Sequence, residues 1–378
     1  MAVKVELSKP VQQLADSIPL DKPALAATVE RILAKADELH YNLGGRIVAG
    51  LDVNGPVVAC GDNNLRPFKG APECIRHLMD LPGVEVTLMT GWDLSTMDFF
   101  RKNKLKQPVG IVGEYGMVYE RKGKTRHLYP YREEERLQFM SAVLNAAAAG
   151  GIKVAFQGNY SPGSGALCVE ADEHGELLKH SLVSGQRPTT EQLFNALKTK
   201  TKAERQGEKI ILDPQPENLQ GAAEALFKTH PLISVRITQA DGGRVALQID
   251  PQDKPEFADL QKVKDFAAVL EKATGREGIV YEDHGIDLLS KLAQEGGFSK
   301  DAGLREYGRE AFGDDNFISA IIGDRGSDIP KTVQNALFFP LAGSVAEPLA
   351  KERKVPSVPV TDVRDFALAL AEAHRLSS

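Results

Sequence analysis

The segment from Arg46 to Leu51 is a short apolar run that follows two glycines and ends at Asp52. A run of this length, composed of apolar or small residues after Arg46, is typical of a β-strand that is buried on both faces. Strands of that kind occur in parallel sheets that carry helices on both sides. The sequence therefore predicts an α/β fold in which Asp52 lies at the carboxyl end of a strand.

Patterns typical of helices and strands alternate along both ends of the chain. This alternation is typical of a doubly wound parallel sheet. A helix capped by Asp21 is expected to end at Gly44–Gly45. The other expected helices lie at 71–81, 94–102 and 362–374, and the expected strands at 84–89, 109–112, 317–322, 335–339 and 355–360.

The length of 378 residues exceeds the usual size of one hydrophobic core, so two domains are expected. The pattern changes in the middle of the chain, where Asp241-Gly242-Gly243 predicts a tight hairpin between two strands. Helices are expected there at 133–148, 190–202, 216–228 and 255–272. We predict an N-terminal helical extension over 1–44, a core formed by 45–117 and 277–378, and an inserted α/β domain over 118–276.

The composition excludes several classes of protein. A net charge of −6 gives no support for general binding to nucleic acid or to an anionic membrane surface. No segment approaches the roughly 20 apolar residues that span a bilayer, and the amino terminus lacks the apolar core of a signal peptide. Three cysteines cannot form a closed set of disulfides. We therefore expect a cytoplasmic protein with reduced thiols, and the sequence leaves its oligomeric state open.

Polar residues follow three of the expected strands at the points where the strands end. They are Asp52, Thr90 and Asp324, the last within Gly323-Asp324-Arg325-Gly326-Ser327-Asp328. Because the carboxyl ends of parallel strands meet at one edge of a sheet, we expect these three side chains to lie close together.

These motifs, taken in order, resemble the haloacid dehalogenase superfamily of phosphohydrolases. The first motif of that superfamily is an Asp two residues before a second Asp, here Asp52 and Asn54, and Thr90 stands for the second motif. Lys300 stands for the third, although Lys272 and Lys291 compete for that place. The fourth motif, Gly-Asp-x-x-Ser/Asn-Asp, is the most specific match and supplies Asp324 and Asp328.

A further resemblance points to the substrate. The segment Gly113-Glu114-Tyr115-Gly116-Met117 resembles the glycine turn that precedes the large α/β cap of sugar-phosphate phosphatases. Trehalose-6-phosphate, sucrose-6-phosphate and mannosyl-3-phosphoglycerate phosphatases have this layout. The resemblance implies a phosphorylated sugar as substrate and an inserted cap that determines specificity.

The resemblance also implies a role for each motif. Mg²⁺ would be held by Asp52, Asp324, Asp328 and the backbone carbonyl of Asn54, and would lie between Asp52 and the phosphate. Asp52 would attack phosphorus and form an aspartyl-phosphate.

The phosphate and the sugar would have their own contacts. Thr90 and Gly91 would bind the phosphoryl group, and Lys300 would offset its charge. Trp92 would either stack on a sugar face or pack beneath the cap.

Asn54 departs from the pattern of the resembling enzymes. An aspartate at this position protonates the leaving oxygen and later activates water, whereas a carboxamide exchanges no proton near neutral pH. Three interpretations stay open: a phosphatase carrying an inactivating replacement, a naturally slow phosphohydrolase, or a catalytically silent protein that binds a sugar phosphate or a partner.

Overall fold

The computed structural model describes most of both ends of the chain and separate elements in its middle. The described residues are 5–18, 20–60, 65–92, 94–128, 154–157, 159–161, 166–168, 191, 194–195, 198, 203–206, 209–212, 237–239, 245–248, 259–274, 278–280, 285–288, 299–332 and 334–378. The chain divides into two compact units. The core unit comprises Met1–Gly91, Met97–Arg126 and Phe298–Ser378, and the second unit comprises Trp92–Thr96 and His127–Gly297.

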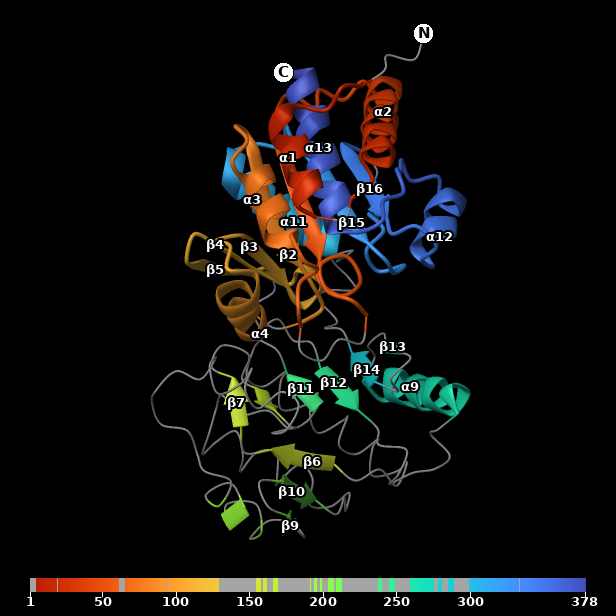
Figure 1. The fold of residues 1–378 in the computed structure, drawn as a ribbon. Helices are drawn as coiled ribbons and strands as arrows, with labels where there is room; N and C mark the ends of the chain where they lie inside the picture. Colours follow the sequence, from red (N-terminus) through yellow and green to blue (C-terminus); the bar gives the residue numbers. More distant parts are fainter. Residues whose placement is uncertain are drawn as a thin grey trace. The chain divides into compact units, whose positions relative to one another are not determined.

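A seven-stranded sheet in the order β16-β15-β1-β2-β3-β4-β5 forms the centre of the core unit (Figure 1). Its five parallel strands are β1 (Ile47–Asp52), β2 (Val84–Met89), β3 (Gly110–Gly113), β15 (Ile318–Gly323) and β16 (Ala336–Pro340). Strand β4 (Val118–Arg121) runs antiparallel to β3 and is followed by β5 (Lys124–His127). Every residue of β1 and β15 is buried, and the expected α/β class is confirmed.

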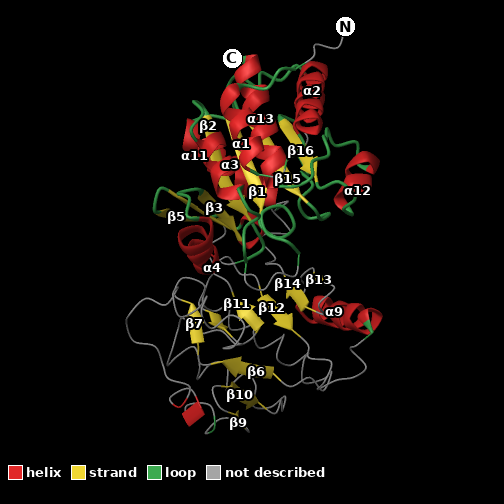
Figure 2. Cartoon of the chain, viewed as in Figure 1, coloured by secondary structure: helices red, strands yellow, loops and turns green. Residues whose placement is uncertain are grey.

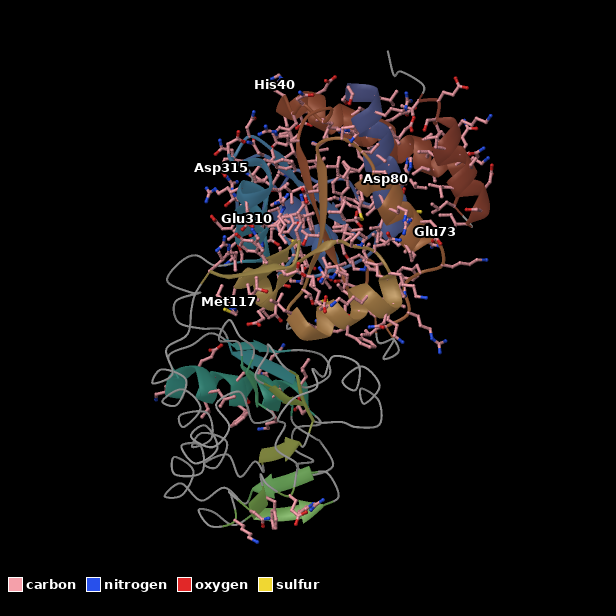
Figure 3. The ribbon with its side chains drawn as sticks, turned by 90° about the vertical axis from the view of Figure 1, so that its left-hand side faces the viewer. His40, Glu73, Asp80, Met117, Glu310 and Asp315 are labelled. Carbon is pink, nitrogen blue, oxygen red and sulfur yellow. The ribbon has the colours of Figure 1, made fainter. Side chains whose placement is uncertain are left out.

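Helices cover both faces of this sheet. Helix α11 (Lys300–Phe312) lies against one face, and α3 (Ala71–Met79), α2 (Lys22–Leu39) and α13 (Val363–Ser377) pack together on the other. Figure 3 shows this sandwich, with Glu310 of α11 and Glu73 of α3 on opposite sides of the strands. The core unit also contains α1 (Lys9–Ser17), α12 (Ala346–Glu352) and the end of α4 (Leu94–Phe99), which begins in the second unit and continues as a π-helical turn over Phe100–Leu105.

The structure differs from the expectations for this unit in three places. The first helix stops at Leu39 rather than at the glycines, because His40 adopts the left-handed conformation (φ 57°) that ends a helix. The segment 355–360 forms isolated bridges rather than a regular strand, but it lies along the edge strand β16 as expected, since Val358 N donates to Phe338 O (3.0 Å) and Val360 N to Pro340 O (3.0 Å). Helix α1 and the pair β4–β5 have no counterpart among the expected elements.

The described residues of the second unit include short antiparallel sheets and a long helix (Figure 2). The expected hairpin is present, as β11 (Ile237–Gln239) pairs with β12 (Val245–Gln248), and α9 (Leu260–Thr274) overlaps the expected helix 255–272. The other strands are β6 (Val154–Gln157), β7 (Asn159–Ser161), β8 (Ala166–Cys168), β9 (Ala203–Gln206), β10 (Lys209–Leu212), β13 (Gly278–Val280) and β14 (Gly285–Leu288). The expected helices 133–148 and 216–228 lie outside the described residues.

A buried carboxylate joins the two ends of the chain. Glu372 of α13 is 1% exposed and accepts hydrogen bonds from the Ser8 backbone N–H (2.9 Å) and hydroxyl (2.7 Å) and from Arg375 Nη2 (2.6 Å). Ser8 immediately precedes α1, so this carboxylate fixes the start of that helix on α13.

Among the described residues, no helix has the length and apolar character to cross a bilayer.

We expect the substitution Glu372→Ala to lower the free energy of unfolding by about 2 kcal/mol, because the half-buried Ser8 N–H and hydroxyl lose their acceptor and the start of α1 loses its attachment to α13. Urea unfolding followed by circular dichroism measures this change. Glu352→Ala, on the exposed end of α12, is the matched control and should change the stability by less than about 0.5 kcal/mol. Equal effects of the two substitutions would contradict the role assigned to Glu372.

Candidate active site

Three carboxylates meet at the carboxyl edge of the core sheet. Asp52 ends β1, Asp324 directly follows β15, and Asp328 lies four residues further on. One oxygen from each lies within 4.8 Å of the others, and Asp52 and Asp328 are only 5% and 1% exposed. The parallel register explains this convergence, since Leu51 pairs with Ile322 in β15.

Lys300 lies among these carboxylates. It is the first residue of α11, whose N-cap Ser299 accepts a hydrogen bond from the Ala302 N–H. The Nζ atom of Lys300 lies 2.7 Å from Asp52 Oδ1 and 2.6 Å from Asp328 Oδ1, and the side chain is buried. The start of α11 thus places Lys300 in the acidic cluster. It is the only buried lysine in the described part of the chain.

The loop after β15 is shaped by Asp328. Its Oδ2 accepts hydrogen bonds from the backbone N–H groups of Asp324 (3.1 Å) and Arg325 (2.9 Å), which closes the turn. A Cβ atom on Gly323 would lie 2.2 Å from Asp328 Cβ, so the turn requires glycine there. Asp328 therefore holds the backbone that carries Asp324 in addition to facing the cluster.

Asp324 has an oxygen suited to a cation. Its Oδ1 atom is enclosed by the protein and has no hydrogen-bond partner among the described residues, while Oδ2 accepts from the thiol of Cys60 at 3.3 Å. A Cβ atom on Gly55, which has a φ of 94°, would lie 2.6 Å from the same Oδ2. An enclosed carboxylate oxygen without a donor is costly unless a cation or a proton meets it.

The charges of the cluster do not balance. Three carboxylates and one ammonium group leave a formal charge of −2, which one divalent cation would neutralise. Burial, and next the charge of Asp328, raise the pKa of Asp52 to about 8, although Lys300 opposes the shift. Burial and Asp328 also raise the pKa of Asp324. Hard oxygen ligands of this kind suit Mg²⁺, so the residues present fit that ion.

Asn54 belongs to a tight loop beside the cluster. The loop is closed by backbone hydrogen bonds from Val58 N to Val53 O (3.0 Å) and from Gly55 N to Val58 O (2.8 Å). Asn54 is half-buried, and the next residue, Gly55, approaches Asp324. The position two residues after Asp52 therefore lies at the rim of the cluster.

Thr90 and Gly91 follow the neighbouring strand, β2. Thr90 is buried, its N–H donates to Val112 O (3.0 Å), and its carbonyl accepts from Tyr115 N (3.0 Å). A Cβ atom on Gly91 would lie 2.6 Å from the Tyr115 ring, so the ring packs against the glycine backbone. Trp92 is half-buried and belongs to the second unit, and Lys291 lies outside the described residues.

Two residues at the site have no counterpart among the predicted site residues. Cys60 contacts Asp324, and Tyr115 contacts Gly91. The glycine turn around Tyr115 was a signal in the sequence, whereas nothing in the pattern around Cys60 indicates its contact with a carboxylate 264 residues away.

Alkylation of Cys60 should report on the cluster. Cys60 is exposed, but partial burial of its thiol and the charge of Asp324 raise its pKa to about 11. We expect iodoacetamide to modify it about 10- to 100-fold more slowly at pH 8 than an ordinary free cysteine. A cation beside Asp324 lowers that pKa, so Mg²⁺ should accelerate the reaction.

Peptide mass spectrometry measures the extent of this modification over time. Buried Cys74, whose pKa is raised to about 12, should stay unmodified, and KCl of equal ionic strength should not replace Mg²⁺. Rapid modification without Mg²⁺ would contradict the contact with Asp324.

Comparisons with known proteins agree on the fold. The sequence matches no protein-family profile and no curated protein. The structure is similar to that of a protein from Thermotoga maritima, with a TM-score of 0.50 and 12% identity over 86% of this chain and 96% of the other. It is also similar to a haloacid dehalogenase subclass IIB sugar phosphatase (TM-score 0.47, 13% identity, 88% and 99% coverage). A third is a haloacid dehalogenase-like hydrolase from Bacteroides thetaiotaomicron (TM-score 0.49, 14% identity, 86% and 98% coverage).

At such identities the similarity concerns the fold alone. It agrees with the expected α/β fold of the core. The narrower resemblance to trehalose-6-phosphate phosphatases is not confirmed by these structures.

Proposed function

We propose that this chain, whose core has the haloacid dehalogenase fold, is a Mg²⁺-dependent phosphohydrolase that acts on a phosphorylated sugar. The observation that carries the proposal is the cluster of Asp52, Asp324, Asp328 and Lys300, which has a formal charge of −2 when all three carboxylates are ionised, together with the Oδ1 of Asp324, which has no hydrogen-bond partner among the described residues. Carboxylates gathered this closely repel one another, and a site without cation chemistry has no need of them.

The nucleophile is Asp52. One of its carboxylate oxygens attacks phosphorus, the bond from phosphorus to the sugar oxygen breaks, and the phosphoryl group remains on Asp52 as an acyl phosphate. Asp324, Asp328 and the carbonyl of Asn54 are the further groups that would hold Mg²⁺. When bound, this ion reduces the repulsion between the carboxylate and the phosphate.

Thr90, Gly91 and Lys300 are assigned to the phosphoryl group. The strand end at Thr90 is held on both sides by backbone hydrogen bonds, and Lys300 is held between two carboxylates, so both are fixed before substrate binds. Fixed donors of this kind stabilise charge that develops on the transferred oxygens. Lys300 remains protonated, since Asp328 and Asp52 raise its pKa against the effect of burial.

Asn54 limits the reaction. The leaving sugar oxygen must take its proton from solvent, and water must attack the acyl phosphate without a general base. We therefore propose a slow enzyme in which the phosphorylated Asp52 persists. Asn54 also favours the second candidate, which is a catalytically silent protein that binds a sugar phosphate or a partner.

The test is phosphate release from a panel of sugar phosphates with and without Mg²⁺, together with calorimetry of Mg²⁺ binding. Release that depends on Mg²⁺ supports the enzyme. Binding of Mg²⁺ and of a sugar phosphate without turnover supports the silent protein, and absence of Mg²⁺ binding overturns both.

A further inference from the structure

A left-handed turn lies between the two groups assigned to the phosphate. Glu114, Tyr115 and Gly116 have φ angles of 53°, 55° and 87°, three successive residues in the left-handed region. Glycine adopts this conformation without cost, whereas a tyrosine there is strained. Strain of this kind persists only where surrounding contacts determine it, and it is concentrated at functional sites.

One side of the turn holds the end of β2. The Tyr115 N–H donates to the Thr90 carbonyl at 3.0 Å, and its ring packs against Gly91 so closely that a Cβ atom there would lie 2.6 Å from Cζ and 2.8 Å from Oη. The ring is 7% exposed. The positions of Thr90 and Gly91 therefore depend on where the tyrosine lies.

The other side of the turn holds the start of α11. A Cβ atom on Gly303 would lie 2.5 Å from Gly116 Cα, and one on Gly116 would lie 2.8 Å from Ser299 O. The backbone of the turn is therefore in direct contact with the backbone at the start of α11. Lys300, the first residue of that helix, has its Nζ 5.9 Å from the centroid of the Tyr115 ring. An ammonium group at this distance is attracted by the face of an aromatic ring, and the attraction is larger in a buried site.

We propose that Tyr115 is a positioning residue that sets Lys300 and the Thr90–Gly91 segment at the separation a phosphoryl group requires. The inference rests on the proposed function, because it assumes that these groups bind phosphate. The contacts that carry it are the backbone hydrogen bond to Thr90, the packing of the ring against Gly91 and the approach of Lys300 to the ring, and of these only the packing includes the hydroxyl.

The test is binding of inorganic phosphate to the full chain in saturating Mg²⁺, measured by calorimetry. We expect Tyr115→Leu to weaken phosphate binding about tenfold, since the aromatic face is lost, and Tyr115→Phe to restore it to within about twofold. Tyr119→Leu is the matched control, because Tyr119 is 6% exposed, lies on β4 and hydrogen-bonds Glu310 instead. That control should lower the melting temperature and leave phosphate binding unchanged.

A second variant displaces the ring without removing it. We expect Gly91→Ala to weaken phosphate binding to a similar degree, and the double variant with Tyr115→Leu to bind no more weakly than either single variant. If Tyr115→Leu fails to fold, Gly91→Ala tests the positioning role in its place.

Each result is decisive. Equal phosphate binding by the unmodified chain, Tyr115→Leu and Gly91→Ala overturns the positioning role alone. Failure of Tyr115→Phe to restore binding also overturns it, because the hydroxyl would then be the group that matters. Absence of phosphate binding by the unmodified chain in Mg²⁺ overturns the proposed function and the inference with it.

Discussion

Replacing Asn54 with aspartate is expected to raise the rate of Mg²⁺-dependent phosphate release by about 10²- to 10⁴-fold. The position lies two residues after Asp52, in the loop whose Gly55 approaches Asp324. A carboxyl group there can give a proton to the leaving oxygen and later remove one from the attacking water. The comparison is made on the sugar phosphate that the unmodified chain hydrolyses or binds best.

A matched control separates this effect from a change in charge. Asn316→Asp adds the same charge to the core unit at an exposed position outside the cluster and should leave the rate unchanged. Acid quenching should also trap more phosphorylated protein from the unmodified chain than from Asn54→Asp, because the acyl phosphate lacks a general base in the former. Equal rates for the unmodified chain and Asn54→Asp would show that another group moves the proton.

The substitution Asp52→Asn is expected to abolish phosphate release in the Asn54→Asp background, with a loss on the order of 10⁴-fold or more. The side chain keeps its size but loses the charge of the nucleophile. No phosphorylated protein should be trapped on acid quenching. Phosphate release within tenfold of the parent would exclude Asp52 as the nucleophile.

Although Asp52→Asn is expected to abolish phosphate release, it should increase the stability of the metal-free protein at high pH. The pKa of Asp52 in the folded protein is about 8, above its ordinary value of 3.8, so the folded state without metal holds a proton that the unfolded state releases. The contribution of Asp52 to stability is therefore present below pH 3.8 and is lost as the pH rises through about 8. In EDTA, Asp52→Asn should melt no lower than its parent at pH 6 and higher than it at pH 9, as measured by differential scanning calorimetry.

The main features of the core could be predicted because they follow from local patterns. Buried parallel strands are recognisable as short apolar runs, and β2 has the predicted bounds, Val84–Met89. Asp52, Thr90 and Asp324 end or follow such strands, so the topology brings them to one edge. Lys300 came from a family motif rather than from spacing, and the structure places it between Asp52 and Asp328.

The rest depends on contacts that no local pattern encodes. The left-handed conformation of Tyr115 is unfavourable for a tyrosine alone and is determined by Gly91, Gly116 and α11. Cys60 gains its importance from Asp324, which is distant in the sequence. The segment 355–360 hydrogen-bonds to β16 as expected of an edge strand, but it contains two prolines without an N–H and forms isolated bridges instead of a regular strand.

The pairing of β1 with β15 has a consequence for how the protein is made. Ile47 pairs with Ile318, so these neighbours are 271 residues apart in the chain (318 minus 47). A ribosome synthesises five of the seven strands, β1 to β5, long before β15, the partner of β1, exists, and contacts of such sequence separation form slowly. Asp52 is therefore synthesised long before Lys300 and Asp324, and chains that stop short of β15 contain Asp52 without the complete cluster of carboxylates.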